Sequence, residues 1–171
     1  MKSVVVIAHN IRSTHNVGSF FRTCDGFGVT HLYLTGYTPY PELSQDTRLP
    51  HIRQKLTAQI HKTALGAETT IPFTYAEQPT TIMADLKKAG YRLVALEQAP
   101  TSILLSAYKA PEKIALLLGE EVHGITADLL ALADDIIEIP MQGQKESFNV
   151  GVSLGIALYG LTSSSSLIHP S

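Results

Sequence analysis

Short apolar runs alternate with longer amphipathic or polar stretches along most of this chain. Runs of β-branched and aliphatic residues that end in polar or glycine-containing segments are typical of strands buried in a parallel sheet. On this pattern we predict strands at residues 3–8, 31–35, 71–75, 91–96, 114–118 and 135–139.

Helices are predicted between these strands. Apolar side chains recur at helical spacing from Val17 to Phe27, so Arg22 would lie beside the apolar face rather than on it. Residues 80–89 are amphipathic, and the apolar segment after Asn149 is also interpreted as a helix. Strands that alternate with helices indicate an α/β fold, with a mostly parallel sheet and helices on both faces.

Polar stretches are predicted to be loops or irregular segments at 9–16, 36–46 and 97–103. On the last predicted helix, Gly151 and Gly155 are four residues apart. A helix without side chains at such positions can approach a neighbouring element closely.

A chain of 171 residues that is 44% hydrophobic can bury a sizeable core. Neither an internal repeat nor a second domain is indicated. We predict one domain at 1–161 and a flexible C-terminal tail at 162–171, where four serines stand in a row.

Charge and cysteine content narrow the classes of protein. The formal net charge of −2 does not indicate a nucleic-acid binder, although a local basic surface can bind RNA on a protein whose net charge is near zero. The single cysteine, Cys24, excludes an intramolecular disulfide or a cysteine-rich zinc site and favours a reducing compartment. Because the first apolar run is too short for a signal peptide and no stretch approaches membrane-spanning length, a soluble cytoplasmic protein is expected.

One segment is strongly basic. Residues 48–62 contain Arg48, Arg53, Lys55 and Lys62 and no acidic residue. A solvated helix face is one interpretation of this pattern, and a surface that contacts phosphates is the other.

Three glycine-containing polar segments follow predicted strands, at 16–22, 119–124 and 143–149. Because parallel strands end at the same edge of a sheet, these segments can converge there. The sequence lacks the G-x-G-x-x-G, P-loop and G-x-S-x-G motifs, and its histidines do not show the spacing of a metal site. Backbone groups and hydroxyls suit a multi-part organic cofactor, and Arg22 suits a phosphate or a developing oxyanion.

These segments resemble the motifs of a known family. N-x-G-x-x-x-R at 16–22, followed by F-G at 27–28, resembles motif one of the SpoU/TrmH branch of the SPOUT RNA methyltransferases. L-G-x-E-x-x-G at 118–124 resembles motif two, and I-P-M-x-G-x-x-x-S-x-N-V at 139–150 resembles motif three. Motif three departs from the usual S-L-N-V-S, since Phe148 replaces the leucine and Gly151 replaces the second serine.

The resemblance implies a methyl transfer from S-adenosylmethionine to a ribose 2′-hydroxyl of RNA, a C-terminal trefoil knot, and a homodimer whose interface completes the site. Neither a metal ion nor a membrane is expected as a partner. By motif position, the cofactor would lie against Leu96, Gly119, Ile139, Met141 and Phe148. The RNA-binding residues would be Arg48, Arg53, Lys55 and Lys62, and the catalytic residues Arg22, Asn16, Glu121, Ser147 and Asn149.

Arg22 is the foremost catalytic candidate. A guanidinium keeps its proton at ordinary pH, so electrostatic stabilisation of a phosphate and an alkoxide suits it better than a role as general base. Asn16 and Asn149 would orient Arg22 or the ribose, Ser147 would donate or accept a hydrogen bond, and Glu121 would fix the loops or Arg22. For the asparagines and the serine, turn and cap roles are equally open.

Other functions stay open. The fold could bind RNA without methylating it, or bind a small molecule as a regulatory module; a nucleotide-dependent oxidoreductase is a third interpretation. Among RNA substrates, transfer RNA is favoured over ribosomal RNA, because the chain has no room for a separate RNA-binding domain.

Overall fold

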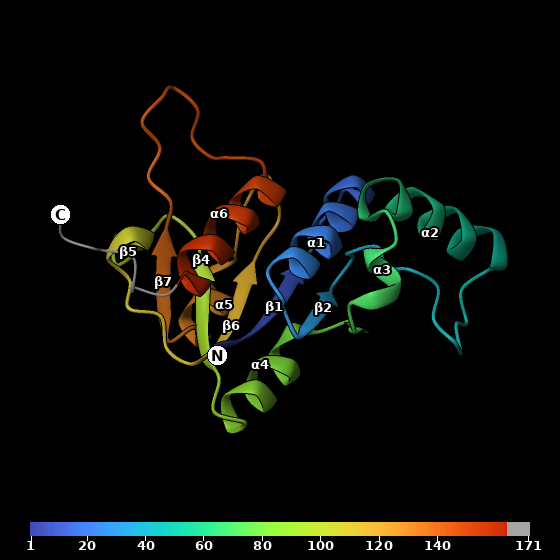
Figure 1. The fold of residues 1–171 in the computed structure, drawn as a ribbon, viewed down its shortest axis with the longest axis horizontal. Coiled ribbons are helices and arrows are strands. Elements are labelled where there is room, and N and C mark those ends of the chain that lie inside the picture. The colour runs from blue at the N-terminus through green and yellow to red at the C-terminus, as the bar shows by residue number, and fades with distance from the viewer. Residues whose placement is uncertain (164–171) are drawn as a thin grey trace.

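A parallel sheet of seven strands forms the centre of the protein, in a computed structural model that describes residues 1–163 (Figure 1). Its strands lie in the order β3-β2-β1-β6-β4-β7-β5. They are β1 (Ser3–His9), β2 (His31–Thr35), β3 (Phe73–Ala76), β4 (Arg92–Leu96), β5 (Ile103–Leu104), β6 (Lys113–Leu118) and β7 (Asp135–Glu138). The helices are α1 (Thr14–Gly26), α2 (Pro50–Ala64), α3 (Ala67–Thr70), α4 (Pro79–Lys88), α5 (Ala127–Leu132) and α6 (Val150–Thr162), with a 3₁₀ turn at Leu105–Ala107.

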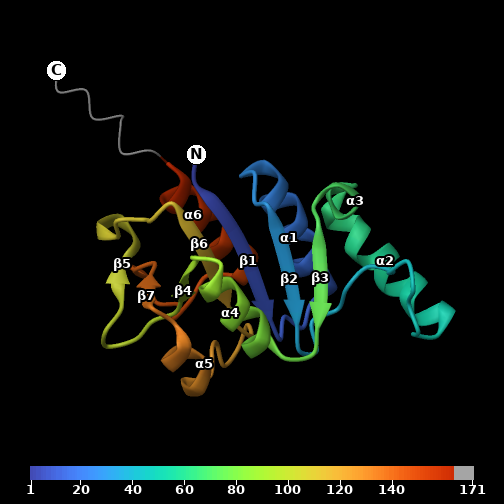
Figure 2. The same ribbon diagram turned by 90° about the horizontal axis from the view of Figure 1, so that it is seen from below.

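Each face of the sheet is covered by its own helices (Figures 1 and 2). On the interior strand β1, Val4 and Val6 belong to the apolar core beneath α1 and α6, whereas Val5 and Ile7 belong to the core beneath α4 and α5. Successive side chains of a strand point to opposite faces, so a strand covered on both sides is apolar at every position. The predicted α/β class, with a parallel sheet between two layers of helices, is confirmed.

The predicted strands are all present, with bounds that differ by at most two residues. The prediction of a polar loop over 9–16 was wrong at its end, because α1 begins at Thr14 and places Asn16 in its first turn. The side chain of Ser13 accepts a hydrogen bond from the Asn16 N–H at 3.2 Å, which is the contact of an N-terminal helix cap. Two short elements, β5 and α3, were not predicted; β5 pairs only at the edge of the sheet, with β7.

Gly18 is the glycine at which α1 approaches α2. A Cβ built there would overlap the Thr63 hydroxyl and the carbonyl oxygen of Ile60. Close approach was predicted on α6 at Gly151 and Gly155, and of these two it holds only for Gly151, whose Cβ would lie 3.0 Å from Ser19 Oγ. At Gly155 a Cβ would meet only Thr23 Cγ2, at 3.9 Å.

Two predictions extend beyond what these residues test. The predicted tail at 162–171 lies outside the described residues from 164 onward, so its boundary stays a prediction, as does the trefoil knot. In residues 1–163, no helix is both long and apolar enough to cross a membrane.

We predict that Gly18→Ala lowers the free energy of unfolding by about 1–3 kcal/mol, because the new methyl group overlaps backbone atoms of α2. The matched control is Gly155→Ala, at which the methyl group has room, and a gain of about 0.5–1 kcal/mol is expected from the better helix former. Chemical denaturation of both variants measures the difference. Equal stability of the two would contradict the packing described for α1 and α2.

Candidate functional site

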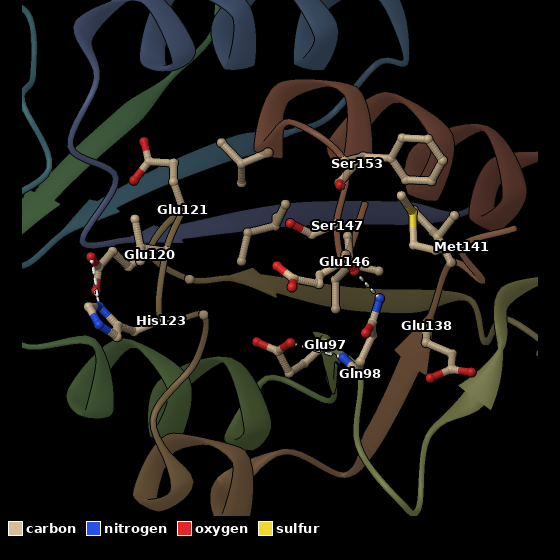
Figure 3. A pocket seen from close by; sticks show the side chains of 18 residues that line it. Glu97, Gln98, Glu120, Glu121, His123, Glu138, Met141, Glu146, Ser147 and Ser153 are labelled. Atoms are coloured by element: carbon tan, nitrogen blue, oxygen red, sulfur yellow. Dashed lines mark hydrogen bonds and ion pairs between the residues drawn. The ribbon is translucent and has the colours of Figure 1, made fainter. Parts of the chain in front are cut away.

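A pocket opens at the carboxyl ends of β4, β6 and β7 (Figure 3). Its walls come from the segment after β4, the loop after β6, and the long loop between β7 and α6 that stands out from the body in Figure 1. All the residues predicted to bind the cofactor line it: Leu96, Gly119, Ile139, Met141 and Phe148. Glu121 and Ser147, predicted to be catalytic, line it as well.

The loop after β6 is held in a tight turn. The Gly124 N–H donates to the Glu120 carbonyl oxygen at 2.9 Å, and a Cβ at Gly119 would overlap the Gly124 carbonyl. The Glu97 carboxylate fixes the far side of this turn, since its Oε2 accepts from the Ile125 N–H at 3.0 Å. The turn therefore brings the backbone of Gly119 and Gly124 close together in the lining of the pocket.

A line of three side chains joins the three predicted segments. Glu121 Oε1 accepts from Asn16 Nδ2 at 3.1 Å, and Asn16 Oδ1 accepts from Asn149 Nδ2 at 3.2 Å. Asn149 Oδ1 in turn accepts from the Gly151 and Val152 N–H groups and caps α6. The predicted convergence of these segments at one edge of the sheet is thus confirmed, although the first of them is part of a helix.

Glu121 also binds the chain just before α1. Its carboxylate accepts from the backbone N–H of Arg12 at 3.2 Å and of Ser13 at 3.3 Å. Partial burial acts to raise the pKa of Glu121, but hydrogen bonds from its own backbone N–H and from Arg12, Asn16 and Ser13 outweigh it and lower the pKa below the usual value. Glu121 therefore stays ionised and ties α1 to the pocket.

The pocket is acidic. Its lining contains five glutamates, Glu97, Glu120, Glu121, Glu138 and Glu146, and within the described residues it contains no lysine or arginine. The partners of Glu97 and Glu138 are neutral: backbone N–H groups for the first and the Ser102 hydroxyl, at 2.7 Å, for the second. Three apolar side chains of the β7–α6 loop, Ile139, Met141 and Phe148, also line the pocket. Such a pocket suits a ligand with an apolar body and a positive charge.

Arg22 lies outside this pocket in the single chain. It is exposed on α1, and it is absent from the pocket lining. Asn16 and Asn149 are also absent from the pocket lining. The predicted catalytic set is therefore split: Glu121 and Ser147 line the pocket, whereas Arg22, Asn16 and Asn149 do not.

Two of the predicted RNA-binding residues are already paired within the chain. Arg48 Nε donates to Asp46 Oδ1 at 2.9 Å, and its side chain is only 17% exposed. Arg53 Nε lies 2.7 Å from Glu42 Oε1, and its Nη1 donates to the Asp46 carbonyl. The structure thus shows both arginines bracing the segment before α2.

The carboxylates of Glu97, Glu138 and Glu146 were not predicted as site residues. Glu97 directly follows β4 and Glu138 is the last residue of β7. The rule that ligands bind at the carboxyl ends of parallel strands would have found these two. Residues 1–163 contain no group of three His, Cys, Asp or Glu side chains placed to hold a metal ion.

Comparison with known proteins gives a consistent result. A sequence profile described as the SpoU rRNA Methylase family matches residues 3–159. The tRNA (guanosine(18)-2′-O)-methyltransferase of Aquifex aeolicus is 27% identical over 158 residues, which are 92% of this chain and 68% of that protein. The 23S rRNA (guanosine-2′-O-)-methyltransferase RlmB of Nitrosomonas europaea is 28% identical over 92% of this chain and 55% of its own length.

Solved structures show the same fold. The AdoMet-bound rRNA methyltransferase from Sinorhizobium meliloti superposes with a TM-score of 0.76 at 24% identity. The match covers 93% of this chain and 55% of that one. This chain thus spans about half the length of the Nitrosomonas europaea and Sinorhizobium meliloti proteins and about two thirds of the Aquifex aeolicus enzyme.

We predict that Glu121→Gln lowers the free energy of unfolding at pH 7 by about 1 kcal/mol, through weaker hydrogen bonds to a neutral acceptor. Because the folded pKa of Glu121 lies below its unfolded value, its contribution is present above about pH 4.5 and is lost as the pH falls further. Unfolding of both proteins from pH 7 to pH 3 should therefore show their stabilities converging. A difference that is independent of pH would contradict this account of Glu121.

Proposed function

We propose that this chain, which belongs to the SpoU rRNA Methylase family, transfers a methyl group from S-adenosylmethionine to a ribose 2′-hydroxyl of RNA. The observation that carries the proposal is the acidic pocket, whose lining includes every residue predicted for the cofactor. Relatives named as 2′-O-methyltransferases of tRNA and of 23S rRNA support the reaction class.

The residues of the pocket fit this cofactor. Ile139, Met141 and Phe148 offer an apolar wall for an adenine ring, and the turn at Gly119 offers backbone donors and acceptors. Bound S-adenosylmethionine would supply a methyl group made electrophilic by a positively charged sulfur. The carboxylates of Glu97 and Glu138, whose partners are neutral, favour that positive charge.

Arg22 is proposed to stabilise the reacting oxygen. A guanidinium can contact a phosphate and the developing alkoxide together, through donors fixed in one plane. In this role Glu121, Asn16 and Asn149 are positioning residues, because their hydrogen bonds fix α1 and α6 against the pocket. Ser147, in the pocket lining, is available to hydrogen-bond the ligand.

A homodimer would supply the missing cation. Arg22 is exposed and lies outside the pocket of its own chain. The resemblance to the SPOUT enzymes implies an interface that completes the site, and an arginine delivered by a second copy meets that need. Val152 and Tyr159, which are 50% and 67% exposed on α6, offer apolar surface for such a contact.

Transfer RNA is the proposed substrate, ahead of ribosomal RNA. Relatives of this chain are named as 2′-O-methyltransferases of tRNA and of 23S rRNA. Mass-spectrometric mapping of ribose methylation, in RNA from cells with and without the protein, would identify the nucleotide. Methylation changes confined to ribosomal RNA would overturn the choice of tRNA.

We predict that Arg22→Lys lowers the rate of methyl transfer roughly 10²- to 10³-fold, because an ammonium cannot reproduce the planar pair of donors. The affinity for S-adenosylmethionine, measured by calorimetry, should not change. A variant with most of the parent turnover would contradict the electrostatic role.

Mixing variants tests where Arg22 acts. Arg22→Ala removes the cation, and Gly119→Ala, whose methyl group overlaps the Gly124 carbonyl, disrupts the pocket. If a partner supplies Arg22, chains carrying one change each should recover part of the activity when mixed. If both variants fold and form dimers but their mixture stays inactive, Arg22 acts in the site of its own chain.

We predict that the double variant Lys55→Gln, Lys62→Gln binds RNA more weakly. The slope of log K for RNA binding against the logarithm of the salt concentration should become shallower by about two. Both residues are exposed on α2, and their seven-residue spacing places them on one helix face. Lys88→Gln with Lys109→Gln is the matched control, since both are exposed near the amino ends of strands. An equal effect of the two pairs would mean that the α2 face is simply solvated.

A further inference from the structure

A second groove lies at the carboxyl ends of β1, β2 and β3, next to the acidic pocket. We call it the tyrosine groove; its main lining residues are Arg12, Gly36, Tyr37, Tyr40, Arg48 and Tyr75. In the described residues its lining includes no carboxylate, whereas the pocket beside it has five. The two sites therefore attract ligands of opposite charge.

The backbone of the groove is rigidly built. Gly36 has φ +68°, and a Cβ there would overlap Asn10 Oδ1. That same oxygen accepts the Tyr37 N–H at 3.1 Å, and Asn10 itself adopts φ 56°. The loops after β1 and β2 are thus locked together, so that the start of the Tyr37 side chain has a fixed position.

In one wall of the groove the Tyr40 ring is already in contact with two neighbouring side chains. The rings of Tyr40 and Tyr75 are stacked with centroids 4.0 Å apart, and the guanidinium of Arg48 lies 3.6 Å from the Tyr40 centroid. The Tyr75 hydroxyl donates to the Gly36 carbonyl at 2.8 Å. In contrast, Tyr37 is 52% exposed and offers an aromatic surface to a ligand.

Arg12 stands at the boundary between the two sites. It lines the tyrosine groove, and its Nη2 lies 3.1 Å from Oε1 of Glu120, which lines the acidic pocket. Its side chain is 70% exposed. A guanidinium has five N–H donors, so its contacts with Glu120 and the Tyr37 hydroxyl leave others for a ligand that crosses the boundary.

We propose that the tyrosine groove binds the RNA nucleotide next to the one that is methylated. The base of that nucleotide stacks on Tyr37, and the phosphate that joins the two nucleotides contacts Arg12. This inference rests on the proposed function, because it takes the acidic pocket as the place where the target ribose meets the methyl donor.

The chemistry of the groove favours an RNA strand. Proteins bind unpaired nucleotides by stacking bases on aromatic rings and by placing arginine against the backbone, and Tyr37 and Arg12 supply both contacts. The glutamates of the neighbouring pocket repel phosphates, so a strand that crosses from one site to the other needs a cation at the boundary. Arg12 occupies that position.

Binding of fluorescently labelled bulk tRNA to the full chain, in the presence of S-adenosylmethionine, tests the proposal. Tyr37→Ala should weaken binding about tenfold, whereas Tyr37→Phe, which keeps the ring, should bind like the parent. Arg12→Gln should make the slope of log K against the logarithm of the salt concentration shallower by about one, and the control Lys109→Gln should leave this slope unchanged. Calorimetry with S-adenosylmethionine should give the parent affinity for Tyr37→Ala.

The outcomes separate this inference from the proposed function. If the parent chain binds and methylates tRNA and Tyr37→Ala binds tRNA equally well, the proposed role of the tyrosine groove is wrong. The proposed methyl transfer is then unaffected. Loss of binding in both Tyr37 variants would show that the hydroxyl, not stacking, makes the contact, and would also overturn it. A parent chain that binds no RNA would overturn both proposals.

Discussion

The hydrogen-bonded line from Glu121 through Asn16 to Asn149 is the constraint on which this site depends. It joins the start of α1, the turn after β6 and the start of α6, which are far apart in the sequence. Each of its amide groups both donates and accepts, so a change at any member leaves a neighbour without its partner. The line thus sets the distance between the two helices and the wall of the acidic pocket.

Charge is divided within the chain in a way that suits two ligands. The acidic pocket favours a cation, and its carboxylates would repel an RNA backbone. The arginines lie elsewhere: Arg12 at the edge of the tyrosine groove, and Arg22 on the exposed side of α1. A small cationic cofactor and a polyanionic substrate can therefore occupy adjacent sites with the reacting atoms at the boundary.

Sequence patterns predicted the sheet and the pocket wall, but not every side-chain role. The strands were predictable because burial on both faces leaves a continuous apolar run, and motif spacing located Gly119 and Phe148 in the pocket lining. The charge run around Arg48 could not reveal that Asp46 folds back onto it, since that contact depends on the irregular chain before α2. Motif spacing could not show that Arg22 lies outside the pocket of its own chain, because the place of a helix side chain relative to a pocket depends on how the elements pack in three dimensions.

Hydrogen–deuterium exchange with and without S-adenosylmethionine tests the central claim most directly, because it maps a ligand onto the chain without assuming an RNA substrate. The account predicts slower exchange of backbone amides in residues 96–98, 118–124 and 139–150, with little change in α4. Unchanged exchange in those three segments at saturating cofactor, or protection confined to another part of the sheet, would contradict it.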